Sequence, residues 1–234
     1  AGGVTKMPKI RRIAGLDVID ESVRRCVETG KPVFGIPGVM TLSEMEAPQT
    51  IAGMSVIKYV CRMAARYNCP FTIFIASPDV LPLAEDTIKG ALAEEGFKVK
   101  YDPSMINYAI GWESTAFGVN YMETAFRLKP ASIIFVGGIG AEGLRVFETG
   151  HRVGAFQIIG TATLTTLPFA AAVADYVLLG EEIYAAGAYL DPDPGQIGGI
   201  VSQDFVKYVI VGLILIGTIL STFGSKWLRD LLTM

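Results

Sequence analysis

A glycine-rich turn is the clearest ligand-binding pattern in the sequence. Residues 138–143 read GIGAEG, with G-x-G-x-x-G spacing, between an apolar run and a helical pattern. Glycines in that context let backbone N–H groups approach a pyrophosphate at a helix N-terminus. A simple tight turn is the alternative, because Glu142 would face the phosphate and the next apolar run ends without an acid for a ribose. The pattern therefore leaves a nucleotide site and a structural turn both open.

Oxygen-bearing side chains follow two other apolar runs. Hydroxyls crowd one loop at Thr161, Thr163, Thr165 and Thr166. They could hold an anion, or they could form local turns and cap the helix that follows. Glu181 and Glu182 could act as acid and base or hold a cation, although acids are also favourable in the first turn of any helix. The candidate ligand-binding residues are thus Gly138, Gly140, Thr161, Thr163 and Glu181.

The sequence assigns no catalytic residue, no metal ligand and no particular cofactor. His151, the single histidine, stands beside Arg152 near the end of a helical pattern. No nucleophile elbow, P-loop or metalloprotease pattern occurs. The three cysteines, Cys26, Cys61 and Cys69, include no Cys-x-x-Cys pair, so we interpret them as buried free thiols in a reducing compartment.

The charge balance argues against a nucleic-acid partner. The net charge is −3, from 20 Lys and Arg against 23 Asp and Glu. A nucleic-acid groove needs a basic stripe, because phosphate contacts dominate its affinity. The one basic cluster, at Lys6, Lys9, Arg11 and Arg12, is more typical of a membrane flank. We therefore expect no nucleic acid among the partners.

Apolar runs alternate with helical patterns through most of the chain. Strands are predicted at 31–36, 71–76, 97–101 (at a sheet edge), 132–136, 155–159 and 175–179. Helices are predicted at 49–66, 81–95, 115–128, 141–150, 166–174 and 181–190. Strands that are apolar throughout are typical of a parallel sheet covered on both faces. This predicts an α/β fold with a doubly wound, mainly parallel, Rossmann-like sheet, whose ligands bind beyond the carboxyl ends of the strands.

The apolar excess of the chain lies near its C-terminus. Residues 208–225 carry no charge, and as a helix they would span about 27 Å, close to the hydrocarbon core of a bilayer. Lys207 and Lys226 flank them, and Tyr208 and Trp227 stand where interfacial aromatic residues belong. A buried core helix would usually show one polar face. We therefore predict one C-terminal transmembrane helix.

Proline and glycine mark the boundary before that helix. Residues 191–199 contain two prolines and three glycines, a composition that ends regular structure. The predicted organisation is a basic segment with a first helix at 1–30, an α/β domain at 31–190, a linker at 191–204, a transmembrane helix at 205–228 and a tail at 229–234.

The stretch 150–190 resembles an uncharacterised family of membrane-anchored prokaryotic α/β proteins. The similar segments are GHRVGAFQIIGTAT, LPF and DYVLLGEEIYAAGAYL, joined by IRRIAGLD at 10–17 and GKPV at 30–33. The resemblance covers most of residues 10–225 and is most specific at 150–190. The family is a domain of unknown function, so it implies no activity. It implies an apolar helix ahead of the basic segment, which would make Lys6 to Arg12 a cytoplasmic flank.

These patterns favour a membrane-anchored scaffold or accessory subunit without catalysis of its own. Its expected partners are membrane lipid, copies of itself in a homo-oligomer, and another membrane-associated complex. Helix faces at 170–174 and 185–189, rich in Ala and Tyr, could form such contacts. The alternative is a small-molecule or nucleotide-binding domain, or an enzyme, using the carboxyl edge of the sheet.

Two patterns bear on which side of the membrane the α/β domain occupies. Free cysteines and the α/β body favour a cytoplasmic domain at the cell inner membrane. Lys226 and Arg229 beyond the helix, against Lys207 before it, favour the opposite orientation. On balance the sequence predicts a cytoplasmic domain.

Overall fold

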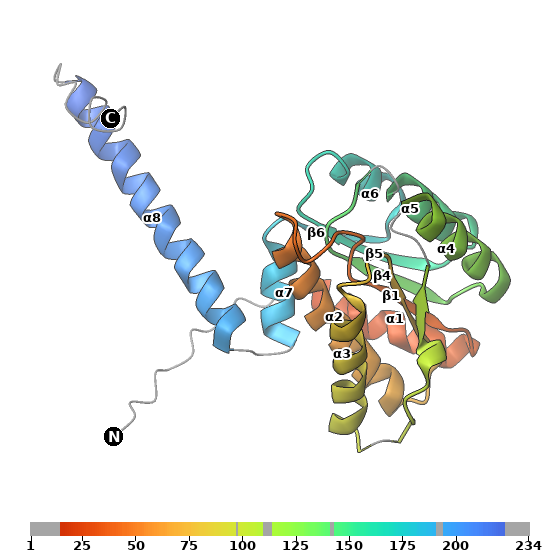
Figure 1. The fold of residues 1–234 in the computed structure, drawn as a ribbon. Helices are drawn as coiled ribbons and strands as arrows, with labels where there is room; N and C mark the ends of the chain where they lie inside the picture. The colour runs from red at the N-terminus through yellow and green to blue at the C-terminus, as the bar shows by residue number, and fades with distance from the viewer. Residues whose placement is uncertain (1–14, 97, 110–113, 141–142, 191–193, 223–234) are drawn as a thin grey trace, which may run out of the picture. The chain divides into compact units, whose positions relative to one another are not determined.

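A computed structural model describes residues 15–96, 98–109, 114–140, 143–190 and 194–222 (Figure 1). The chain divides into two compact units, and the larger, Ile10–Pro192, is called the body below. The described part of the other unit is one helix. The division falls at Pro192 and Asp193, next to the boundary expected near residue 191.

A six-stranded sheet forms the centre of the body. Its strands are β1 Val33–Ile36, β2 Phe71–Ile75, β3 Ile106–Tyr108, β4 Ser132–Val136, β5 Phe156–Thr161 and β6 Tyr176–Leu179. Their order is β3-β2-β1-β4-β5-β6, and every neighbouring pair is parallel. The strand order reverses between β1 and β4, which is the switch point where doubly wound sheets bind ligands. The predicted fold class is confirmed.

Helices cover both faces of this sheet (Figure 1). They are α1 Gly15–Thr29, α2 Ala47–Arg66, α3 Leu81–Glu94, α4 Ser114–Leu128, α5 Gly143–Arg152, α6 Leu167–Val173 and α7 Glu182–Leu190. The apolar side chains of α1, α2, α3 and α7 form one buried cluster, and those of α4, α5 and α6 form another. Alternate strand residues feed the two clusters, with Ile134 in the first and Ile133 and Phe135 in the second. Burial on both faces explains why these strands read as uninterrupted apolar runs.

The edge strand predicted at 97–101 is wrong. Among the described residues the edge next to β2 is β3, Ile106–Tyr108, preceded by a short 3-10 helix, Pro103–Met105. The Asp102 carboxylate accepts a hydrogen bond from the Ser104 N–H at 2.7 Å, which starts that turn. Val99 is half-buried while Lys98 and Lys100 are exposed. The alternation that suggested a strand therefore reflects one anchored side chain in a loop.

Helix α8, Pro194–Thr222, makes up the described part of the second unit. The linker expected at 191–204 is therefore helical from residue 194, since proline suits the first position of a helix. Val201–Ile219 is a 19-residue stretch long and apolar enough to cross a membrane, and none of it is buried. The expectation of one such helix is confirmed at this level, and residues 223–228 of the predicted span lie outside the described residues.

Two of the three cysteines are bonded to each other. Cys26 on α1 and Cys69, just before β2, form a disulfide across 43 residues of sequence. Cys61 is free and buried, and burial raises the pKa of its thiol to about 12. The interpretation of three free thiols is thus correct for Cys61 and wrong for the other two. Spacing could not reveal this pair, because only the packing of α1 beside β2's entry brings the residues together.

Candidate functional site

The switch point between β1 and β4 is closed by the chain's own backbone. The loop after β1 lies against the glycine turn after β4, and the Val39 N–H donates to the Gly138 carbonyl at 2.9 Å. On the other side, the Gly137 N–H donates to the Gly160 carbonyl of β5 at 2.8 Å. The Val39 and Gly137 N–H groups are used in these bonds and cannot donate to a phosphate. The turn is thereby tied to both neighbouring strand ends.

Glycines at this point allow main chain to touch main chain. Gly38 has φ +94°, and a Cβ there would lie 2.8 Å from the backbone N and O of Gly138. A Cβ on Gly138 would lie 2.9 Å from side-chain carbons of Met40 and Glu46. A Cβ on Gly53 of α2 would overlap the Val136 carbonyl at the end of β4. Close internal packing therefore accounts for these glycines.

The loop after β5 is fastened to the beginning of α2. The buried Gln49 side chain accepts a hydrogen bond from the Ala162 N–H at 3.0 Å. Within the loop, the Thr161 hydroxyl accepts from the Thr163 N–H at 3.1 Å, and the Thr166 hydroxyl donates to the Thr163 carbonyl at 3.0 Å. Thr166 makes no side-chain cap bond to α6. These threonines form local turns, as one of the two sequence interpretations states.

Two hydroxyls at this edge have no hydrogen-bond partner among the described residues. They are the buried Oγ1 atoms of Thr50, in the first turn of α2, and Thr163, in the loop after β5. Buried hydroxyls are nearly always paired, because an unmade bond costs about 1–3 kcal/mol. In the sequence, Thr50 follows Gln49 and Thr163 follows Ala162, the two residues that the hydrogen bond described above joins. These two hydroxyls are therefore buried polar groups whose hydrogen bonds the described residues do not supply.

Carboxylates dominate the charge of this edge. They belong to Glu44, Glu46, Asp79, Glu181 and Glu182, which lie in the loops after β1, β2 and β6 or begin the helix that follows. An added phosphate would meet repulsion here. The balance of charge is therefore unsuited to the pyrophosphate that the G-x-G-x-x-G spacing would hold.

Besides Glu44, which accepts from the Thr41 N–H at 3.2 Å within its own loop, two of these acids bond to nearby backbone. The Asp79 carboxylate accepts from the Ser77 hydroxyl and, at 2.7 Å, from the Leu42 N–H, which ties the loops after β2 and β1 together. Partial burial raises the pKa of Asp79, but these hydrogen bonds outweigh it and hold the pKa below its usual value. The Glu182 carboxylate accepts from the Leu179 N–H at 2.9 Å. Both acids thus hold loops in place.

The predicted site residues lie along one edge but form no enclosed constellation. Gly138 and Glu181 follow β4 and β6, and Thr161 is the last residue of β5, the strand between them. Gly140 is half-buried and its carbonyl accepts from the Gly143 N–H at 3.1 Å, while Glu142 lies outside the described residues. His151 is exposed in the last turn of α5, at the opposite edge. Over the part of the chain that the structure describes, no three His, Cys, Asp or Glu side chains gather as a metal site would require.

Sequence reasoning missed Gln49 and Thr50. Both are polar residues buried in the first turn of a helix whose other buried positions, apart from Ser55, are apolar. Two polar residues at a helix start read equally well as solvent-facing, so the pattern alone could not identify them. Their role depends on which loop packs against them.

The comparisons with known proteins identify a family and no activity. No curated protein and no solved structure matches the chain. A family described as "Domain of unknown function (DUF6754)" matches residues 3–232, nearly the whole chain. The match covers the parallel sheet, its two helical layers and α8 together. The chain therefore belongs to the DUF6754 family of unknown function.

Proposed function

We propose that this protein is a membrane-anchored scaffold or accessory subunit of a larger homo-oligomeric assembly, without catalysis of its own. The observation that carries the proposal is the closed switch point, where the Val39 N–H bonds to the Gly138 carbonyl and the Gly137 N–H bonds to the Gly160 carbonyl. In a doubly wound sheet this is the position that a substrate or cofactor would occupy. Because backbone fills this position, no substrate would be bound there, and the proposed role of the fold is to hold partner proteins in place.

Helix α6 and the loop before it supply a candidate contact surface. Residues 153–174 contain no charged residue, yet Leu164 is 79% exposed and Phe169 is 45% exposed. Ala171 and Ala172 are also exposed. Exposed apolar side chains without charged neighbours favour protein contacts. The face at 185–189 is less suitable than expected, because Ala186 and Ala188 are buried and α7 packs on α2.

The oligomer is tested by native mass measurement of the full chain extracted in detergent. We expect a homo-oligomer that a Leu164→Glu/Phe169→Glu double variant converts to monomer, because charges would be forced into an apolar interface. Tyr67→Glu is the matched control, since Tyr67 is 51% exposed at the far end of α2 and should leave the oligomer intact. A wild-type chain that is strictly monomeric and brings no other protein with it contradicts the proposal.

The position of the body relative to the membrane also belongs to the proposal, and we revise the expected cytoplasmic side. The Cys26–Cys69 disulfide favours an oxidising compartment. The bias of Lys226 and Arg229 over Lys207 points the same way, since positive flanks stay inside. We propose a body on the non-cytoplasmic face. A membrane-impermeant amine reagent should then label Lys98 and Lys129, both exposed, on intact cells, and labelling only after lysis would restore the cytoplasmic assignment.

A second candidate function is favoured by the unpartnered hydroxyls of Thr50 and Thr163. A small polar ligand could complete both bonds at the carboxyl edge of the sheet. A panel of nucleotides and acidic metabolites, added to the full chain, tests this by thermal shift. A ligand at one hundred times its Kd would stabilise the body by about 2.7 kcal/mol. If no compound in the panel raises the melting temperature, this second candidate is contradicted and the scaffold proposal is the one that remains.

A further inference from the structure

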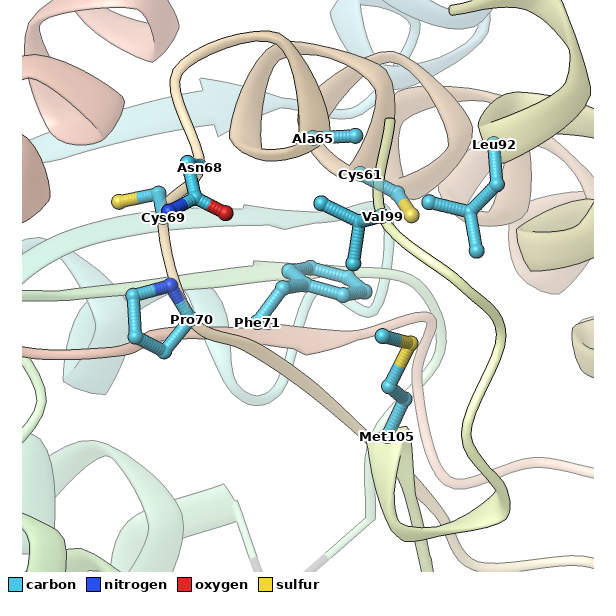
Figure 2. Close-up of a pocket in the computed structure, with 9 residues that line it drawn as sticks. All are labelled: Cys61, Ala65, Asn68, Cys69, Pro70, Phe71, Leu92, Val99 and Met105. Atoms are coloured by element: carbon cyan, nitrogen blue, oxygen red, sulfur yellow. The ribbon is translucent and has the colours of Figure 1, made fainter. Parts of the chain in front are cut away.

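A cavity opens at the edge of the sheet opposite the closed switch point (Figure 2). Its volume is about 260 Å³, and it lies where α2 and α3 end and β2 begins. Its apolar lining comes from Cys61, Ala65, Phe71, Leu92, Val99 and Met105. Figure 2 shows the Phe71, Leu92, Val99 and Met105 side chains gathered around a common space, whereas the Cys69 sulfur points away from it.

Ion pairs outside the cavity hold α2 and the end of α3 together. Arg62 and Lys58 of α2 pair with Glu94 at 2.9 and 3.0 Å, and Arg66 pairs with Glu95 at 2.6 Å. These ion pairs join the ends of α2 and α3 without entering the cavity. The other walls are the segment that enters β2, the 3-10 helix that carries Met105, and the loop that carries Val99, which belongs to no helix or strand. The cavity therefore lies between the paired helices α2 and α3 on one side and more irregular segments on the other.

The lining chemistry selects an apolar ligand. Among the described residues no charged side chain lines the space, and burial raises the pKa of the Cys61 thiol, which keeps that group neutral at physiological pH. Apolar cavities do not hold ordered water well and accept hydrocarbon, as a cavity of about 150 Å³ accepts benzene. A space of about 260 Å³ is small for a drug-sized molecule, for which pockets begin near 300 Å³. A slim hydrocarbon chain suits it better than a bulky ring system.

The rim of the cavity suits a ligand with a polar end. Asn68, which also lines the cavity, is exposed and takes a left-handed backbone conformation with φ 53°. Lys98 and Lys100, on either side of Val99, are exposed. A polar head group could therefore remain in water while the tail enters between Phe71 and Val99. An amphiphile satisfies both parts of the cavity.

We propose that this cavity binds the hydrocarbon tail of an amphiphile, with a membrane lipid as its source. The tail itself is argued from the cavity. The choice of a membrane lipid rests on the proposed membrane anchoring by α8, because that anchoring places the body where acyl chains are abundant. A free fatty acid has the same tail chemistry and is distinguished by experiment.

The rate at which N-ethylmaleimide alkylates Cys61 at pH 9, where more of the thiol is ionised, provides a local test, because this thiol lines the cavity and the other two cysteines are bonded to each other. The full chain is compared in a fluorinated surfactant, in the same surfactant with decanoic acid, and in lipid nanodiscs. We expect decanoic acid at ten times its Kd to slow alkylation about elevenfold, since a tail would shield the thiol. Slowing in nanodiscs as well supports a membrane lipid as the source. Slowing by decanoic acid alone supports the site and overturns the lipid source, and equal rates in all three conditions overturn the site.

A cavity-filling variant separates the site from general protection. Ala65→Phe should fill the space and remove the effect of decanoic acid, whereas Ala93→Phe, at an exposed position of α3, should retain it. If Ala65→Phe does not fold, the three-condition comparison on the wild-type chain still decides. Insertion of the chain into nanodiscs is scored separately by co-elution, so a failure of membrane anchoring is distinguishable from an empty cavity.

Discussion

Tyr121 shows how a single buried oxygen can work against the fold around it. The side chain is fully buried on α4 and packs edge-on against Phe74 at 5.2 Å between ring centroids. Its hydroxyl has no hydrogen-bond partner among the described residues, and burial raises its pKa. By contrast, the Tyr59 hydroxyl donates to the Asp20 carboxylate at 2.8 Å and joins α1 to α2. The two tyrosines therefore predict opposite responses to loss of the hydroxyl.

Tyr121→Phe should raise the free energy of unfolding by about 1 kcal/mol, because it removes a buried polar group that lacks a partner. Tyr59→Phe should lower it by about 1 kcal/mol, because it breaks a made bond. Thermal unfolding of the full chain, followed by near-ultraviolet circular dichroism, measures both. A clear loss of stability in Tyr121→Phe would show that the hydroxyl has a partner after all.

Asp79 gives a pH dependence with a definite sign. Its hydrogen bonds from Ser77 and Leu42 hold the folded-state pKa below the unfolded one. The ionised carboxylate therefore stabilises the fold above about pH 4, the unfolded pKa, and this contribution disappears as pH falls through the folded pKa. The advantage of wild type over Asp79→Ala should be constant from pH 7 to 5 and shrink below pH 4. An advantage independent of pH down to 2.5 would contradict this.

At the scale of elements, the strands could be predicted from the sequence, whereas the packing of α2 against the carboxyl edge of the sheet could not. Each buried strand except β3 was predictable, since uninterrupted apolar runs such as Ser132–Val136 leave little choice. The same reasoning placed Gly138 and Thr161 on one edge, because parallel strands end together. Gln49 and Val39 close that edge by bonding to the loops after β5 and β4. These bonds depend on how closely α2 and the loop after β1 approach those loops, and a sequence pattern does not contain that spacing.

A pair of glycine substitutions tests this close approach. Gly53→Ala should lower the free energy of unfolding by about 1–3 kcal/mol, because the new methyl group would overlap the Val136 carbonyl. Gly90→Ala, on the open side of α3, should raise it by up to about 1 kcal/mol through helix propensity. Urea unfolding of the two variants side by side measures the difference. Equal effects would mean that α2 lies farther from β4 than described.

At the scale of the whole molecule, the disulfide is a covalent cross-link between α1 and the entry to β2. It closes a segment of 43 residues that contains β1 and α2. Loop-closure entropy for that length corresponds to about 4 kcal/mol, so Cys26→Ala/Cys69→Ala should lose about 2–4 kcal/mol of stability. Mass spectrometry after alkylation of the denatured, unreduced chain should find one modified cysteine, Cys61. Three modified cysteines would restore the free-thiol interpretation and remove the argument for an oxidising compartment.

Helix α8 gives the second prediction at this scale. Ile214, which is 61% exposed, stands in the apolar stretch Val201–Ile219. Ile214→Arg should reduce recovery of the chain in the membrane fraction, because a central arginine adds about 2.5–3.5 kcal/mol to insertion. Ile214→Leu is the matched control and should fractionate as wild type does. If truncation after Pro192 also leaves the chain in the membrane fraction, α8 is not the anchor.

Helix α7 is the last described element of the body before the chain passes to α8. Its inward residues, Ile183, Ala186 and Leu190, are buried in the same cluster as α2. A pull applied along this part of the chain would therefore act first on the packing between α7 and α2, before it reached the sheet. Substitutions that loosen this packing should free the end of the body while the six strands stay paired.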